Sequence, residues 1–288
     1  MQQNKTIAAV LAEGKKQLRA AGREDYAAEL LMQHVLGVDR TGLLIRLPNE
    51  LEQGPRNQFL SGIKSMESGI PLQYVTGCEE FFGRTFRVTP DVLIPRPETE
   101  ELVEGALSRA SRIWPSEGSP LRMADIGTGS GAIAVSFKLG RPDAEVTATD
   151  ISSAALRVAK ENAERLGASI SFAEGDMAEP LTGGKWDIIL SNPPYIAPAE
   201  AVGMADTVTG HEPHGALFAE EEGLKHYRTL AHALPALMKR PGLVGVEIGH
   251  TQGPAVSGLF AEAFPDGDVK VVCDINGKDR FVFCELLK

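Results

Sequence analysis

Apolar residues recur at helical spacing through the first quarter of the chain. One stripe runs over 7–18 and a second over 26–35, and in both the apolar side chains stand three or four positions apart. That spacing places them on one face of a helix. Shorter segments of the same kind lie near 40–47 and after Pro55. The pattern predicts a small bundle of amphipathic helices over residues 1–75.

The pattern changes after the bundle. Residues 80–88 are rich in aromatic and β-branched side chains around Gly83-Arg84, which predicts a β-hairpin that turns there. Three prolines follow within 90–97 and hold the backbone extended. We therefore interpret residues 76–96 as a β-hairpin and proline-rich linker between two domains.

Strands and helices are expected to alternate over residues 97–288. Proline suits the first position of a helix, so a helix is predicted from Pro97 to about residue 114. Runs typical of strands follow at 121–126, 144–149, 169–174, 186–191, 242–248, 269–275 and 280–286, with helical patterns between most of them. The alternation predicts a doubly wound α/β domain with a mostly parallel sheet. The Asn276-Gly277 turn between the last two runs makes a terminal strand antiparallel.

Length and cysteine content narrow the class of protein. The chain has 288 residues, enough for two domains of about 100–200 residues each. Cys78, Cys273 and Cys284 are far apart, which argues against a disulfide scaffold and fits a reducing compartment. The sequence shows no signal-peptide pattern and no apolar run of the roughly 18 residues that a membrane helix needs. We expect a cytoplasmic protein, without membrane contact and monomeric.

Charge is distributed unevenly between the two predicted domains. Residues 1–75 hold 9 Lys and Arg against 8 Asp and Glu, whereas the remaining residues hold 20 against 31, a net charge of −11. Affinity for nucleic acid depends largely on Lys and Arg that displace counterions from phosphates. We therefore expect no direct binding to nucleic acid.

A glycine-rich turn follows the first strand of the α/β domain. Gly127-Thr128-Gly129-Ser130-Gly131 precedes a helix and lets a ligand approach the backbone closely. Asp150 ends the next strand, 23 residues beyond Gly127, where a carboxylate can accept hydrogen bonds from both ribose hydroxyls. The pair predicts a ligand that contains ribose. A nicotinamide dinucleotide also satisfies the pattern, whereas Asp125 just before the turn suits a cationic sulfonium better.

A third contact is expected after the strand over 169–174. The carboxyl ends of parallel strands face one crevice, so Asp176 could accept from an adenine amino group and Met177 could pack on its ring. A purely turn-forming role for Asp176 explains the sequence nearly as well.

Asn192-Pro193-Pro194-Tyr195 ends the strand over 186–191. Proline has a fixed φ and no N–H, so the turn is stiff and leaves two acceptors, the Asn192 side-chain oxygen and the Pro193 carbonyl. Two fixed acceptors beside an aromatic face suit a planar NH₂ group with Tyr195 against it. The nitrogen of an amide or aryl NH₂ is a poor nucleophile because its lone pair is delocalised, so holding both of its hydrogens favours a lone pair directed at an electrophile. The turn predicts catalysis by positioning and electrostatics.

These motifs resemble those of class I S-adenosylmethionine-dependent methyltransferases that act on amino nitrogens, and the whole chain resembles the HemK/PrmC family. The likeness rests on the Asp125–Gly131 segment, Asp150, the Asn-Pro-Pro-Tyr turn, Ile94-Pro-Arg-Pro-Glu-Thr-Glu100 and Asn276-Gly-Lys-Asp-Arg280. The resemblance implies a Rossmann-like fold and methyl transfer to the side-chain nitrogen of a glutamine in peptide-chain release factors. It also implies that the N-terminal bundle recognises the protein substrate.

The resemblance assigns roles to particular residues. Its cofactor-binding residues, those for S-adenosylmethionine, are Gly127, Thr128, Gly129, Ser130, Gly131, Asp150, Asp176, Met177 and Asn192. Its catalytic residues are Asn192, Pro193, Pro194 and Tyr195. Many relatives carry an aromatic residue where Met177 stands, which favours simple apolar packing there.

Other functions account for fewer of these features. A ribosomal-protein glutamine methyltransferase would share the catalytic turn, and so would an adenine N6-methyltransferase, which the acidic α/β domain disfavours. A nicotinamide dehydrogenase explains the glycine turn and leaves the Asn-Pro-Pro-Tyr turn without a role. A non-enzymatic binding module conflicts with the intact acceptors at Asn192 and Pro193.

Two histidine-containing features do not predict a metal site. His34 lies in an apolar stripe without a partner ligand, so we expect a packed core histidine. In His211-Glu-Pro-His214 the spacing differs from HExxH, and Pro213 would break the helix that such a motif needs. We expect no metal, and a substrate-facing loop around 210–214.

Overall fold

The computed structural model describes residues 5–115 and 120–287, which fold into two compact units. One unit contains the chain up to Cys78 together with Ala205–His211. The other contains Glu79–Met204 and continues from Glu212. The loop that follows the Asn-Pro-Pro-Tyr turn therefore contributes a short segment to the first, helical unit.

The helical unit is the bundle that the apolar spacing predicts. Its helices are α1 (Ile7–Ala20), α2 (Ala27–Leu36), α3 (Arg40–Arg46), α4 (Gln53–Glu67), α5 (Leu72–Thr76) and α9 (Asp206–Thr209). Side chains cap two of them: Thr6 accepts from Ala9 N at the start of α1, and Asp39 accepts from Gly42 N at the start of α3. The buried core includes Leu18, Met32 and Phe59. Arg23 forms a two-pronged ion pair with Asp206 of α9 within this unit, at 2.5 and 2.8 Å.

Two predictions for this unit are wrong in detail. Helix α4 begins at Gln53 and so contains Pro55 in its first turn, where the missing N–H of proline has no intrahelical partner to lose. His34 is exposed and not a core histidine. The buried face of α2 is formed by Ala28, Leu31 and Met32, and His34 lies at the edge of that stripe.

The β-hairpin turns one residue earlier than predicted. Strands β1 (Cys78–Phe81) and β2 (Arg84–Arg87) are joined by Phe82 and Gly83, both with positive φ, 51° and 69°. A two-residue hairpin turn of this kind matches the twist of its strands. The Glu100 side chain accepts from Phe82 N at 2.9 Å, which helps to hold the aromatic residue in this conformation.

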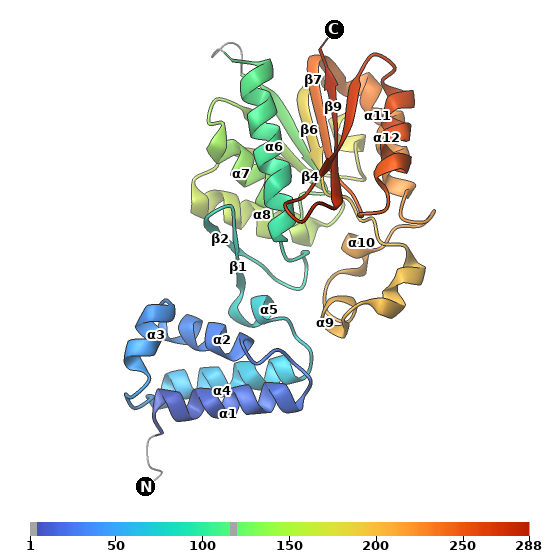
Figure 1. The fold of residues 1–288 in the computed structure, drawn as a ribbon. Helices are drawn as coiled ribbons and strands as arrows, with labels where there is room; N and C mark the ends of the chain where they lie inside the picture. Colours follow the sequence, from blue (N-terminus) through green and yellow to red (C-terminus); the bar gives the residue numbers. More distant parts are fainter. Residues whose placement is uncertain (1–4, 116–119, 288) are drawn as a thin grey trace. The chain divides into compact units, whose positions relative to one another are not determined.

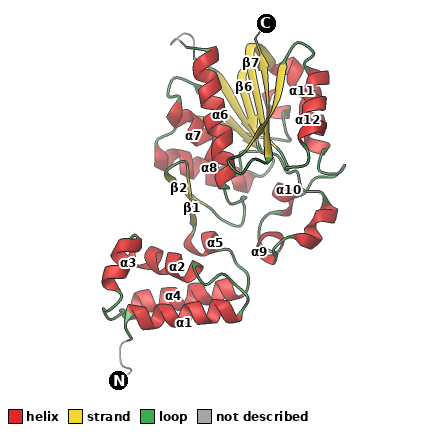
Figure 2. Ribbon diagram, in the orientation of Figure 1, coloured by secondary structure: helices red, strands yellow, loops and turns green. Residues whose placement is uncertain are grey.

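The second unit contains the predicted doubly wound, mostly parallel sheet, so the fold class is confirmed (Figure 2). Its strands are β3 (Arg122–Ile126), β4 (Glu145–Asp150), β5 (Ile170–Glu174), β6 (Trp186–Ser191), β7 (Met238–Glu247), β8 (Asp268–Cys273) and β9 (Asp279–Leu286). They lie in the order β5-β4-β3-β6-β7-β9-β8. The first five are parallel, and β9 runs antiparallel to both β7 and β8.

Helices cover both faces of this sheet (Figure 1). Helices α6 (Pro97–Ile113), α7 (Ala132–Gly140) and α8 (Ser153–Leu166) pack on one face, and α11 (Lys225–Leu237) and α12 (Gly253–Ala263) on the other. Short helices η1 (Glu179–Leu181), η2 (Pro198–Gly203) and α10 (His214–Leu217) lie in the loops around β6. The central strands β3 and β6 are buried on both faces, as expected for parallel strands between helical layers, whereas the edge strands β5 and β8 are partly exposed.

Strand boundaries differ from the prediction mainly at β7. It starts at Met238, which pairs with Trp186 before a register shift, and not at residue 242. Strand β8 ends at Cys273, because the next residue, Asp274, turns to accept from the backbone amides of Asn276 and Lys278.

Candidate active site

The predicted site residues lie at the topological switch point of the sheet. Strand β3 pairs with β4 on one side and β6 on the other, and the chain runs outward through β4 and β5 before returning to β6. Parallel strands end at one edge, so the turns after β3, β4, β5 and β6 meet there. This is where ligands bind in open α/β sheets. The fold thus brings together the glycine turn, Asp150, Asp176 and the Asn-Pro-Pro-Tyr turn.

The glycine turn has the backbone shape that its composition requires. Gly127, Gly129 and Gly131 all have positive φ, between 53° and 83°. Four of the five amides donate within the protein: Gly127 and Thr128 to Thr149 O, Gly131 to Thr128 O, and Gly129 to Asp150 Oδ2. A pyrophosphate needs free amides at this position. The internal bonds therefore favour a ligand that fits the shape of the turn over a dinucleotide.

Beneath the turn lies a buried carboxyl group. Asp125 is fully buried, and its Oδ2 accepts from Thr128 Oγ1 at 2.6 Å and from Ala134 N at 3.1 Å. Its Oδ1 has no hydrogen-bond partner among the described residues. Burial raises the pKa of this carboxyl to about 7. An added Cβ at Gly127 or Gly129 would meet no atom within 4 Å, so the space over the turn is open.

Asp150 connects the glycine turn to the next helix. Its Oδ2 accepts from Gly129 N and its Oδ1 from Ser152 N, both at 2.9 Å. Burial raises the pKa of Asp150, and these two bonds oppose the rise. Each carboxylate oxygen keeps a further lone pair, so Asp150 can still accept from a diol.

The third predicted contact is less enclosed. Asp176 is exposed after β5, and Met177 is half-buried with a φ of 46°. Met177 packs against the apolar core between the sheet and helices α11 and α12. The structure thus places Met177 in apolar packing and leaves Asp176 accessible at the edge of the sheet.

The Asn-Pro-Pro-Tyr turn is held both by the sheet and by helix α6. Ser191 Oγ donates to Ile126 O at 2.7 Å, which joins the ends of β6 and β3. Asn192 Nδ2 donates to Thr99 Oγ1 at 3.1 Å. Pro193 is buried. The turn therefore stands beside the glycine turn with one side of the Asn192 amide already engaged.

Tyr195 is held through its backbone. Gln252 Nε2 donates to Tyr195 O at 3.0 Å, and Gln252 Oε1 accepts from Gly249 N at 2.9 Å. Burial, followed by the charge of Glu247, raises the pKa of Tyr195 to about 12. Its hydroxyl therefore stays protonated at neutral pH.

Several polar residues around the turn are not evident from sequence reasoning. Glu247 is fully buried at the end of β7 and accepts from Thr99 Oγ1 at 2.6 Å. Burial raises the pKa of Glu247 to about 7. The only sequence signal for Thr99 and Arg280 is their place in the two motifs that carry the family resemblance. Glu247 is a single acidic residue at the end of a strand-like run, and no sequence pattern there identifies it as part of a site.

The histidine-containing loop has a structural role that its motif does not suggest. Glu212 is buried, accepts from Ile94 N at 3.2 Å and forms an ion pair with Arg96. The loop thereby holds the proline-rich segment ahead of α6. Within residues 5–115 and 120–287, no group of three or more His, Cys, Asp or Glu side chains could hold a metal ion.

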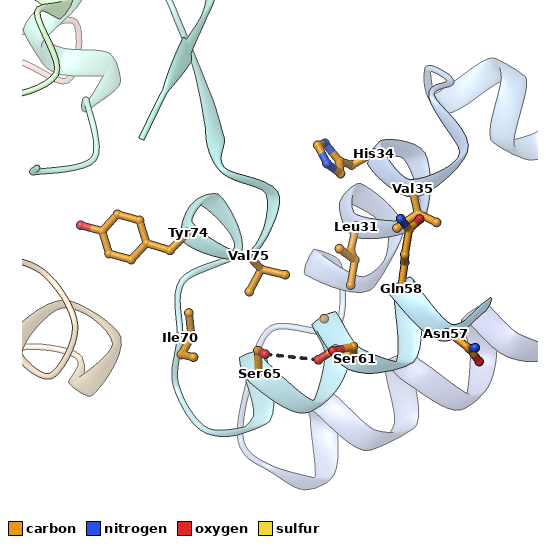
Figure 3. A pocket seen from close by; sticks show the side chains of 11 residues that line it. Leu31, His34, Val35, Asn57, Gln58, Ser61, Ser65, Ile70, Tyr74 and Val75 are labelled. Atoms are coloured by element: carbon orange, nitrogen blue, oxygen red, sulfur yellow. Dashed lines mark hydrogen bonds between the residues drawn. The ribbon is translucent and has the colours of Figure 1, made fainter. Parts of the chain in front are cut away.

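The helical unit contains a separate groove of about 850 Å³ (Figure 3). Helices α2, α4 and α5 line it with both apolar and hydrogen-bonding side chains. The lining residues include Leu31, His34, Gln58, Ser61 and Tyr74. A groove of this composition suits a peptide segment better than a metal or a small apolar ligand.

Comparisons with known proteins agree with this geometry. The family model for the methyltransferase small domain matches residues 115–208, and the model for the PrmC N-terminal domain matches residues 9–77. A methyltransferase from Pyrococcus furiosus has a similar fold, with a TM-score of 0.50 and 15% identity over 82% of this chain and all of that one. A 16S rRNA N2 G1207 methyltransferase from T. thermophilus also has a similar fold, with a TM-score of 0.50 and 20% identity over 72% of this chain and 49% of that one. The matched domain model and the fold indicate the class of this protein, a methyltransferase.

Curated relatives identify the family. The release factor glutamine methyltransferase of Bacillus anthracis is 45% identical over 93% of this chain and 95% of its own. That of Bacillus subtilis (strain 168) is 44% identical over 98% of both chains. The protein of the same name from Neisseria gonorrhoeae is 40% identical over 91% of this chain and 93% of its own. The chain belongs to the release factor glutamine methyltransferase family, and the predicted resemblance is confirmed. No helix in the described part of the chain is long and apolar enough to cross a membrane.

Proposed function

We propose that this protein transfers a methyl group from S-adenosylmethionine to the side-chain amide nitrogen, N5, of a glutamine in peptide-chain release factors. The observation that carries the proposal is the stiff pair of acceptors, Asn192 and Pro193, beside the glycine turn at the switch point of the sheet. Family membership supports the choice of glutamine and of release factors.

The residues around the glycine turn fit a cationic, ribose-containing cofactor. Open space over Gly127 and Gly129 leaves room for it, and the unpartnered Asp125 Oδ1 suits a positively charged group nearby. Asp150 would accept from the ribose hydroxyls, and Met177 would pack beside adenine with Asp176 at its amino group. Thr128, Ser130 and Gly131 complete the turn against which the cofactor would lie. When bound, S-adenosylmethionine supplies an electrophilic methyl group.

The Asn-Pro-Pro-Tyr turn would position the glutamine. Asn192 Oδ1 and Pro193 O each accept one hydrogen of the substrate NH₂, while Pro194 keeps the turn rigid and Tyr195 packs on the amide plane. Engaging both hydrogens reduces delocalisation of the nitrogen lone pair into the carbonyl. The protein forms no covalent intermediate in this scheme, and its contribution is orientation and electrostatic stabilisation.

Mass spectrometry of candidate substrates tests this function. The protein is incubated with isotope-labelled S-adenosylmethionine and either a purified release factor or a mixture of ribosomal proteins. We expect label on one glutamine side chain of the release factor. Label on a ribosomal protein alone, or on adenine in added RNA or DNA, would contradict the proposed substrate.

Product binding distinguishes the cofactor classes. At a concentration 100 times its Kd, S-adenosylhomocysteine should stabilise the α/β unit by about 2.7 kcal/mol. For a chain of this size that corresponds to a rise in melting temperature of roughly 5–10 °C. NAD at the same concentration should give no rise in a thermal-shift measurement. Stabilisation by NAD and not by S-adenosylhomocysteine would contradict a methyltransferase.

We further propose three domains: a recognition domain at 1–75, a hairpin linker at 76–96 and a methyltransferase domain at 97–288. The groove in the helical unit supports the recognition role, because its hydrogen-bonding and apolar side chains together suit a segment of the release factor. Replacing Ser61 with Arg should fill the groove and raise KM for the release factor about 10-fold, with an unchanged affinity for S-adenosylhomocysteine. Thr41→Arg, on the exposed side of α3, is the control. Equal KM values for the two variants would contradict recognition through the groove.

The remaining partner and location assignments follow from composition. The three free cysteines support a reducing, cytoplasmic location. The net charge of −11 outside residues 1–75 supports a monomeric enzyme that does not bind nucleic acid directly.

A further inference from the structure

The buried Thr99–Glu247 pair lies directly behind the proposed catalytic Asn192. Thr99 is at the third position of α6, Glu247 ends β7 and Asn192 follows β6, so three separate elements converge on this point. Both Thr99 and Glu247 are buried, at 4% and 2% exposure. A buried carboxyl group needs a specific reason to be retained in a sheet, because its desolvation is costly.

The direction of the hydrogen bonds determines how the Asn192 amide is oriented. When the Glu247 carboxyl is ionised, Thr99 Oγ1 donates its only hydrogen to Glu247 Oε2, at 2.6 Å. In that state Thr99 can only accept from Asn192, and it does so from Nδ2 at 3.1 Å. In a planar amide the oxygen and nitrogen lie on opposite branches. With Nδ2 facing Thr99, Oδ1 must face away from the buried pair.

The surroundings keep Glu247 in place as the final acceptor. The positive charge of Arg280 attracts it, and Asp274 holds Arg280 Nε at 3.2 Å. Tyr227 Oη donates to the backbone carbonyl of Glu247 at 2.8 Å. Hydrogen bonding from the Asn192 side chain also opposes the rise in the pKa of Glu247. Arg280 of β9 and Tyr227 of α11 thus hold Glu247 in place. Glu247 is the last acceptor in the chain of hydrogen bonds and sets its direction.

We propose that Thr99 and Glu247 are positioning residues, which hold Nδ2 of Asn192 toward the protein interior so that Oδ1 is presented to the substrate amide. This inference rests on the proposed function, because it assumes that Asn192 Oδ1 accepts from the glutamine. Neither residue touches the substrate in this scheme. Without the pair, the Asn192 amide could rotate and present donors to a group that needs acceptors.

A matched pair of variants at residue 99 tests the proposal. Thr99→Ser keeps the hydroxyl, whereas Thr99→Val keeps the shape and removes it. We expect kcat of T99V to fall about 10-fold and that of T99S to stay within about 2-fold of the wild type. The affinity for S-adenosylhomocysteine, measured by calorimetry, should be unchanged in both. Equal kcat for T99V and T99S, or an equal loss in both, would overturn the positioning role.

Glu247→Gln provides a second test that does not depend on the folding of T99V. Glutamine can donate to Thr99, which frees the threonine hydrogen to bond with Asn192 Oδ1 and so removes the orientational constraint. We expect about a 10-fold lower kcat in E247Q. The control is Glu285→Gln, a buried strand glutamate on β9 that pairs with Arg109 and Arg112. Equal kcat for E247Q and E285Q would overturn the inference.

Labelling of the release factor and kcat of the variants distinguish a failure of this inference from a failure of the proposed function. If the wild-type protein labels no release factor glutamine, the proposed function fails. If it does label one and T99V and E247Q match it in kcat, the proposed function stands and the positioning role is overturned.

Discussion

Replacing Asn192 with Ala is expected to reduce kcat for glutamine methylation by about 10²–10³-fold, the range found when one preorganised hydrogen-bonding group is removed from an active site. The turn keeps its two prolines in this variant, so Pro193 O still accepts one substrate hydrogen. The second hydrogen loses its acceptor, and the amide nitrogen is no longer held in one orientation. Steady-state kinetics with labelled S-adenosylmethionine measure the change.

The affinity for S-adenosylhomocysteine separates this effect from a loss of the cofactor site. It should change little in N192A, because the glycine turn and Asp150, which supply most of the predicted cofactor contacts, do not depend on the Asn192 side chain. Asn49→Ala, the same truncation at an exposed position of the helical unit, is the control and should keep wild-type kcat. If N192A turns over at more than about a tenth of the wild-type rate, the acceptor argument is wrong.

Local sequence patterns predict most of the fold. The residues of β6 match the prediction over 186–191, and α6 begins at Pro97 as expected. Both have strong local signals, a continuous apolar run for the strand and a proline at the first helical position. The hairpin turn lies one residue earlier than its composition predicts, because Phe82 takes a positive φ, which its residue type does not favour. A contact from Glu100, distant in sequence, supports that conformation.

The residues of the candidate site also fall into two groups, those that the local sequence predicts and those that contacts distant in sequence bring together. The glycine turn and the Asn-Pro-Pro-Tyr turn are continuous segments, so their chemistry can be read from residue order. The groups that orient them come from separate elements: Thr99 from α6, Glu247 from β7 and Gln252 before α12. Their proximity is produced by sheet order and helix packing, which single-residue patterns do not encode. The exposure of His34 differs from the prediction for a related reason, since an apolar stripe does not specify which of its edges is covered.

Gly223 lies against the back of the Asn-Pro-Pro-Tyr turn, and Gly223→Ala is expected to displace it. Gly223 has a φ of 81°, and an added Cβ would come within 2.1 Å of Tyr195 O and 2.5 Å of Gln252 Nε2. These two atoms form the hydrogen bond that holds Tyr195. A backbone oxygen cannot move without moving the turn. A shift of about 1 Å in a positioned reactant can cost on the order of 100-fold in rate.

We therefore expect G223A to lose about 10- to 100-fold in kcat. Positive φ alone costs an alanine about 1–2 kcal/mol, so stability will fall as well and must be separated from the displacement. Gly167→Ala is the matched control: its φ is 74°, and its added Cβ would meet no atom within 4 Å. G167A should lose a similar amount of stability from the backbone and keep wild-type kcat. Thermal unfolding and steady-state kinetics on both variants distinguish the two effects. A kcat for G223A equal to that of G167A would show that catalysis does not require the turn to be held in this position.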